Sequence, residues 1–122
     1  MPYQILLFSQ GAGKFEVLRD KIPKITTARL LALRYSREYQ SHNSGMVIYL
    51  MDDPSPKSHI TFASVFAKEK IYWMPDGRSY SDRSTYSPDE NLKNKSPTLH
   101  TRYSINGRTG EIKFMKEWRK SW

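Results

Sequence analysis

The chain has 122 residues, and its 20 lysines and arginines against 12 aspartates and glutamates give it a formal net charge of +8 at pH 7. The absence of cysteine excludes disulfides and thiolate metal sites, and it permits a reducing compartment. The length predicts a single domain over residues 1–122, with a core that must draw heavily on aromatic residues.

The amino-terminal segment predicts a first strand over residues 3–9. The run Ile5–Phe8 is apolar, and Gln10–Gly13 ends it. Because the run is short and lacks the flanks of a signal peptide, we expect no membrane association and a cytoplasmic location. Residues 15–25 carry apolar side chains at near-helical spacing, but Phe15 and Val17 also alternate as in a strand, and Pro23 interrupts either pattern. We predict a short helix here.

The clearest helical pattern begins near residue 26. Ala28, Leu31 and Tyr35 recur at spacings of three and four, which predicts one amphipathic helix over Thr27–Ser41. Its start is capped in this prediction by Thr26 or Thr27, since a threonine hydroxyl accepts a hydrogen bond from a free amide of the first turn. The polar residues that fall largely outside the apolar stripe are Arg29, Ser36 and Gln40.

An uninterrupted apolar run, Met46–Met51, follows the helix. Such a run predicts a central strand that is covered on both faces. Asp52 and Asp53 come next, but adjacent residues of an extended chain point in opposite directions, so we interpret them as part of a turn rather than as an acid-base pair. Residues 60–66 and 71–74 then predict an antiparallel hairpin.

Residues 78–99 are dominated by polar side chains and predict a long polar loop. Loops of this length inside compact domains are uncommon and are often functional, so the segment is either a contact element or a solvated connector. Beyond it, the alternation over residues 101–105 and 112–114, joined by a loop with two glycines, predicts a second hairpin. A basic aromatic tail follows at residues 113–122.

Together these elements predict an α+β fold, in which one main amphipathic helix packs on a mostly antiparallel sheet of about five to six strands. The net charge of +8 favours a polyanionic partner, either nucleic acid or an acidic nucleoprotein surface. Tryptophan stacks on exposed bases while lysine and arginine neutralise phosphates. The residues that we predict to bind nucleic acid are Arg102, Arg108, Lys113, Lys116, Trp118, Arg119 and Lys120.

An alternative hypothesis is a metal-independent ribonuclease, because cleavage assisted by the ribose hydroxyl requires a general base, a general acid and a cationic group. The residues of these chemical types are His59, His100, Arg102, Tyr103 and Arg108. Of these, His100, Arg102 and Tyr103 are the candidate catalytic residues. The hairpin over residues 103–112 and the order of the elements resemble, in outline, the small bacterial ribonuclease toxins. That resemblance implies catalysis on the sheet face.

A further alternative is an inhibitor or adaptor that binds a protein partner, since exposed Tyr, Trp and Arg dominate interface energetics. The histidines His42, His59 and His100 do not stand at zinc-binding spacing, and we expect neither a metal nor a cofactor. No complete catalytic motif is present. We therefore favour a small non-enzymatic binding protein, of a composition that suggests phage or mobile-element origin.

Overall fold

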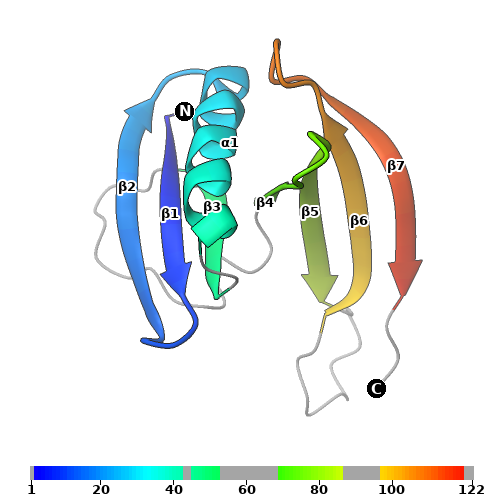
Figure 1. The fold of residues 1–122 in the computed structure, drawn as a ribbon. Coiled ribbons are helices and arrows are strands. Elements are labelled where there is room, and N and C mark those ends of the chain that lie inside the picture. Colours follow the sequence, from blue (N-terminus) through cyan, green and yellow to red (C-terminus); the bar gives the residue numbers. More distant parts are fainter. Residues whose placement is uncertain (1, 43–44, 53–68, 87–96, 120–122) are drawn as a thin grey trace.

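The structure is a computed structural model that describes residues 2–42, 45–52, 69–86 and 97–119. Within these ranges the chain forms one helix and seven strands (Figure 1). Their bounds are β1 Tyr3–Ser9, β2 Lys14–Ile22, α1 Ile25–His42, β3 Met46–Asp52, β4 Glu69–Trp73, β5 Ser79–Tyr86, β6 Pro97–Ile105 and β7 Ile112–Arg119.

All seven strands belong to one antiparallel sheet with the order β2-β1-β3-β4-β5-β6-β7. The helix carries the chain from edge strand β2 across to β3 on the other side of β1, and the remaining strands follow in sequence order. The predicted α+β class with one helix on an antiparallel sheet is confirmed. The predicted number of strands was too small, because two segments without a clear strand pattern are strands.

The first of these segments is β2, which we had predicted as a short helix. Its register with β1 places Phe15 opposite Phe8 and Val17 opposite Leu6. The rings of Phe8 and Phe15 lie 4.6 Å apart, and such cross-strand aromatic pairs stabilise a sheet. Contacts with β1 therefore decide between the helical spacing and the strand alternation of the apolar residues in this segment.

The second segment is β5, which lies in the predicted polar loop 78–99. Ser79–Tyr86 forms a strand instead, and β6 already begins at Pro97; residues 87–96 lie outside the described residues. The strand is polar, but it pairs with β4 on one side and β6 on the other, and Ser81 is fully buried. Ladder hydrogen bonds and tertiary packing thus override a weak strand propensity.

The two predicted hairpins fare differently. Residues 101–105 and 112–114 pair as predicted in β6 and β7, but β7 continues to Arg119, so most of the predicted tail is a strand. Residues 60–66, in the first arm of the earlier predicted hairpin, lie outside the described residues. Its second arm is β4, which pairs with β3 and β5.

The apolar core lies between α1 and one face of β1 and β3 (Figure 1). Ile5, Ile48 and Leu50 meet Ala28 and Ala32 of the helix, and all five are essentially removed from solvent. On the other face of the sheet a second buried cluster contains Leu6, Val47, Tyr49 and Met51. Strand β3 is therefore buried on both faces, as its uninterrupted apolar run predicted.

The helix is longer than predicted and its polar side chains are used differently. It begins at Ile25, and the amide of Ala28 bonds to the carbonyl of Lys24 at 3.0 Å, so Thr26 and Thr27 lie inside the first turn instead of capping it. Ser36 is fully buried and donates to the carbonyl of Ile71 at 3.1 Å. The sequence pattern had placed this serine largely outside the core-facing stripe.

Gln40 makes the same kind of contact with β4. Its amide nitrogen donates to the carbonyl of Ile71 at 3.2 Å, and its oxygen accepts from the amide of Trp73 at 3.2 Å. The ladder between β3 and β4 pairs only three residues of each described strand, Ile48–Leu50 with Glu69–Ile71. Polar side chains of the helix therefore satisfy backbone groups of β4 beyond the end of that ladder.

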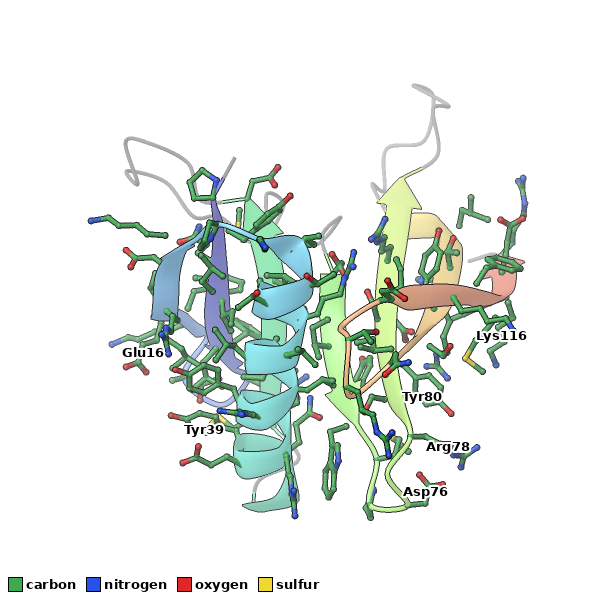
Figure 2. All side chains as sticks on the ribbon, turned by 90° about the horizontal axis from the view of Figure 1, so that it is seen from above. Glu16, Tyr39, Asp76, Arg78, Tyr80 and Lys116 are labelled. Carbon is green, nitrogen blue, oxygen red and sulfur yellow. The ribbon has the colours of Figure 1, made fainter. Side chains whose placement is uncertain are left out.

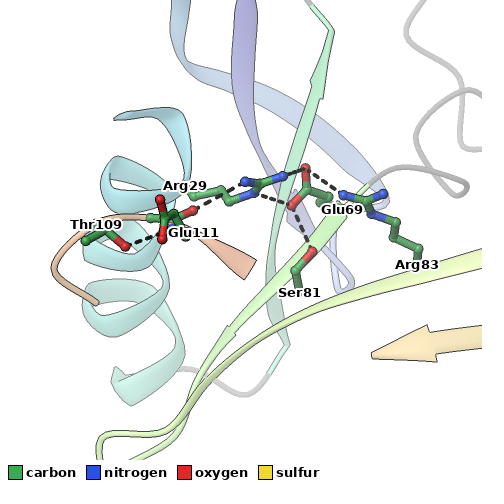
Figure 3. A network of polar contacts seen from close by, with 7 residues as sticks. Arg29, Glu69, Ser81, Arg83, Thr109 and Glu111 are labelled. Carbon is green, nitrogen blue, oxygen red and sulfur yellow. Dashed lines mark hydrogen bonds and ion pairs between the residues drawn. The ribbon is translucent and has the colours of Figure 1, made fainter. Parts of the chain in front are cut away.

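A buried ion pair joins the helix to the other half of the sheet (Figure 3). The Nε of Arg29 donates to Oε1 of Glu69 at 2.9 Å, and each residue is only 8% exposed. Ser81 donates to the same carboxylate oxygen at 2.8 Å, and Arg83 lies 3.5 Å from Oε2. Arg29 also donates to the carbonyl of Gly110 at 3.3 Å, so one side chain connects α1, β4 and the β6–β7 turn.

Gly110 is required at that turn for two reasons. Its φ of 76° lies in the left-handed region, and a Cβ at this position would stand 2.3 Å from the carbonyl oxygen of Thr26. Gly13 has a similar φ of 63°, but nothing lies within 4 Å of the corresponding position. Alanine substitutions at the two glycines therefore distinguish the cost of backbone strain, which both share, from the cost of steric overlap, which arises only at Gly110.

We predict that Gly110→Ala lowers the free energy of unfolding by about 2–5 kcal/mol, because it adds an overlap with the helix backbone to the left-handed strain. Gly13→Ala, which carries the strain alone, should cost about 1–2 kcal/mol. Urea denaturation of the two variants measures both effects. Equal losses would contradict the close approach of the turn to Thr26.

A second prediction concerns the buried ion pair. Glu69→Gln keeps the shape of the side chain but leaves the guanidinium of Arg29 without its counter-charge, so it should cost about 3–5 kcal/mol. The control is Asp76→Asn, which removes the exposed pair with Arg78 and should leave the urea midpoint unchanged. A Glu69→Gln midpoint that matches the control would show that the pair does not hold the helix to the sheet.

Candidate nucleic-acid interface

The sheet face opposite the helix carries a cluster of aromatic and basic side chains on β4–β7. Glu69 and Ile71 point toward the helix, so Lys70 and Tyr72 point away from it, because side chains alternate along a strand. The strand register extends this face in rows across the sheet. We call it the outer face; its residues include Lys70, Tyr72, Tyr80, Asp82, Ser84, His100, Arg102, Lys116 and Trp118.

Arg102 lies at the centre of the outer face. Its Nε and Nη2 each donate to one carboxylate oxygen of Asp82 at 2.8 Å. Its guanidinium carbon lies 4.7 Å from the ring centre of Tyr80 and 5.6 Å from that of Trp118. The hydrogen bonds with Asp82 raise the pKa of Arg102, while partial burial acts in the opposite direction. The pair fixes the two rings relative to each other, and Asp82 offsets the charge of Arg102.

Trp118 forms the aromatic platform of the outer face. Its ring stacks on His100 with centroids 5.3 Å apart and an interplanar angle of 14°, and Lys116 places its Nζ 5.3 Å from the same indole. The Nδ1 of His100 lies 2.9 Å from the hydroxyl oxygen of Ser84, which orients the imidazole. Trp118 stays partly exposed and Lys116 exposed, so a ligand can reach both. Figure 2 shows Lys116 at the margin of the molecule.

Tyr72 lies on β4, opposite Tyr80 on the same face of the sheet. Burial, with a smaller contribution from the negative charge of Asp82, raises the pKa of Tyr72 to about 12, although the charge of Arg102 acts against the shift. The Nζ of Lys70 lies 5.2 Å from the Tyr72 ring. At neutral pH the phenol is therefore uncharged. Among the outer-face residues named above, Asp82 is the one that carries a negative charge.

The structure brings only some of the predicted nucleic-acid-binding residues together. Arg102, Lys116 and Trp118 meet on the outer face, and the register places exposed Lys113 opposite Ser104 on the same face. Arg119 pairs with Leu99 and points to the opposite face. Arg108 lies in the exposed β6–β7 turn, and Lys120 lies outside the described residues.

The residues of the ribonuclease hypothesis divide between two faces. His100 and Arg102 share the outer face, but Tyr103 lies on the other, where its ring meets Phe114 edge-on at 6.1 Å. The guanidinium of Arg83 lies 5.0 Å from the Tyr103 ring on that side. His59 lies outside the described residues. Tyr103 therefore does not converge with His100 and Arg102 on one phosphate.

Several members of the outer face were missed in the sequence. Tyr80, Asp82 and Ser84 alternate with residues that point to the helix side of the sheet. Because both faces of this strand carry polar residues, the period of two gives no contrast in hydrophobicity and was not recognised. Lys70 was missed as well, because it follows Lys68 and Glu69 in a charged run that predicts a loop between the two arms of the earlier hairpin.

Comparisons with known proteins add no relative: no family model, curated protein or solved structure matches the chain. Within the described ranges, no helix has the length and apolar character needed to cross a membrane. In the same ranges, no three side chains of the His, Asp or Glu types are grouped so as to hold a metal ion. The functional inference therefore rests on the side-chain chemistry of the two sheet faces.

We predict that the stability of the protein falls as the pH rises from 10 through about 12, partly through Tyr72. Its folded-state pKa of about 12 exceeds the ordinary value of 10.0, so the folded state retains the phenolic proton that the unfolded chain loses. The stabilisation from Tyr72 is complete below pH 10 and is lost as the pH rises from 10 through about 12. Urea denaturation as a function of pH should give a shallower decline for Tyr72→Phe, and identical slopes would contradict the shift.

Proposed function

We propose that the protein is a non-enzymatic binding protein for single-stranded nucleic acid, free or within a nucleoprotein complex, and that it binds through the outer face. The observation that carries this proposal is the arrangement at Trp118, a partly exposed indole stacked on His100 with Lys116 beside it. An aromatic platform with adjacent cations is the combination that binds a base and its phosphate together.

The open shape of a sheet face favours single strands over duplexes. Stacking on an aromatic ring requires an unpaired base whose face is accessible, as in proteins that bind single strands on the surface of a sheet. Trp118 is held rigidly, since His100 supports one side of its ring and Arg102 approaches it as well. A pre-ordered platform loses little conformational entropy when a base stacks on it.

In this proposal, lysine side chains bind the phosphates. Arg102 is engaged by Asp82 through two hydrogen bonds, which leaves its charge largely offset. Lys113 and Lys116 are exposed, and both lie on the β7 strand that carries Trp118. We therefore assign Arg102 to the support of the aromatic rings and the two lysines to the backbone of the ligand.

The test measures fluorescence anisotropy of labelled DNA and RNA strands over a range of salt concentrations. Trp118→Ala should lower affinity for single strands by about 1–3 kcal/mol through the lost stacking contact. Lys116→Ala should reduce the slope of log affinity against log salt by about 0.7. The matched control is Lys24→Ala, which removes the same charge from an exposed site before α1 and should leave that slope nearly unchanged.

Three outcomes would overturn parts of the proposal. Equal affinity for a duplex of the same sequence would contradict base stacking on Trp118. The absence of salt-sensitive binding to any strand would remove nucleic acid as the partner and favour the inhibitor hypothesis. RNA shortened in the same samples without metal, and left intact by His100→Ala, would replace binding with the ribonuclease alternative.

A further inference from the structure

A second basic site lies on the helix side of the sheet, away from the outer face. A pocket of about 360 Å³ opens between α1, the β4–β5 turn and the β6–β7 turn. Arg34 and Arg37 line it from the helix, Arg108 from the β6–β7 turn and Trp73 from the end of β4. Its volume falls in the range of pockets that hold small organic ligands. We call it the arginine pocket.

The charges of the arginine pocket are not balanced by carboxylates. Elsewhere in the described structure, Arg29, Arg78, Arg83 and Arg102 each contact an aspartate or a glutamate. Among the described residues, no acidic side chain lines the arginine pocket, and Arg34, Arg37 and Arg108 make no ion pair. Three cations around one pocket repel one another, and an anion bound between them would relieve this repulsion.

Two of the three arginines come from one helix face, because residues three apart are neighbours on a helix. The third is positioned by its turn, where Oδ1 of Asn106 accepts from the amide of Arg108 at 2.9 Å and from that of Thr109 at 3.2 Å. The arginine pocket therefore owes its charge to segments that lie more than 70 residues apart in sequence. The contact of Gly110 with the helix holds these segments together.

Trp73 adds a planar surface to the arginine pocket. Its backbone amide donates to Gln40, and the guanidinium of Arg37 lies 5.5 Å from the centre of its ring. Trp73 stays partly exposed. Aromatic rings and guanidinium planes are the surfaces on which nucleobases stack. A planar heterocycle and a phosphate would thus find complementary groups within one pocket.

We propose that the arginine pocket binds a nucleotide, with the phosphate between Arg34 and Arg108 and the base against Trp73 and Arg37. A free nucleotide and the phosphorylated end of a strand present the same chemistry, so both are sources of this ligand. The site lies on the opposite side of the sheet from Trp118 and does not depend on binding at the outer face.

The test is isothermal titration calorimetry of the full chain with AMP, adenosine and inorganic phosphate. AMP should bind saturably, and both adenosine and phosphate should bind at least tenfold more weakly, because each lacks one half of the contacts. Arg34→Gln and Arg108→Gln should each lower AMP affinity on the order of tenfold, as expected for a lost hydrogen bond to a charged group. Trp73→Phe should weaken AMP binding and leave phosphate binding unchanged.

The matched control is Arg19→Gln, which removes an exposed guanidinium from edge strand β2 and should leave AMP affinity unchanged. Thermal unfolding confirms that each variant is folded. Trp118→Ala should also retain AMP binding, so that failure of the outer face and failure of the arginine pocket are distinguishable. In the Trp118→Ala variant, which lacks the outer-face platform, tighter binding of a 5′-phosphorylated oligonucleotide than of AMP would identify the strand end as the source. The reverse order would identify the free nucleotide.

The proposal is overturned if AMP and adenosine bind equally, or if Arg34→Gln and Arg108→Gln behave as Arg19→Gln does. It is also overturned if phosphate alone binds as tightly as AMP, because Trp73 would then contribute no stacking. A glutamate-rich peptide that binds more tightly than AMP, and whose binding is lost in the Arg34→Gln variant, would instead assign the arginine pocket to an acidic protein partner.

Discussion

The buried pair of Arg29 and Glu69 is the interaction on which the arrangement of the sheet depends. Among the described residues, the ladder between β3 and β4 joins three residues of each strand, and the helix adds a second attachment between the strands from β4 onward and the first half of the molecule. Arg29 supplies it by reaching Glu69 and the Gly110 carbonyl, while Ser36 and Gln40 bond to the backbone of β4. The helix thus packs on β1 and β3 through apolar contacts and on β4 through hydrogen bonds.

The two faces of strands β4–β7 carry different polar networks. On the helix side, Glu69 gathers Arg29, Ser81 and Arg83 into a buried network (Figure 3). On the outer face, Asp82 binds the guanidinium of Arg102, which lies near the rings of Tyr80 and Trp118. In both places an acidic residue occupies the guanidinium of an arginine, so that this arginine has a structural role. The basic side chains of the arginine pocket and of β7 have no such partner among the described residues, and these are the groups to which we assign anion binding.

The sequence supported the parts of the fold in which hydrophobic pattern and structure share a period. The run Met46–Met51 and the stripe of Ala28, Leu31 and Tyr35 show burial directly, because their neighbours differ in polarity. The strand at Ser79–Tyr86 is polar on both faces and gives no such contrast. Trp118 and Lys116 were recognised as candidates by composition alone, while the partners of Trp118, His100 and Arg102, come from the neighbouring strand β6.

By itself, the sequence determined the α+β class, the main helix, the buried central strand and the carboxy-terminal hairpin, since each follows from local periodicity or turn chemistry. Only the tertiary structure decided which arginines are paired and which remain available. A guanidinium has the same local sequence signal in a buried ion pair as at an open pocket. The difference lies in carboxylates contributed by distant strands, as Glu69 and Asp82 are to Arg29 and Arg102.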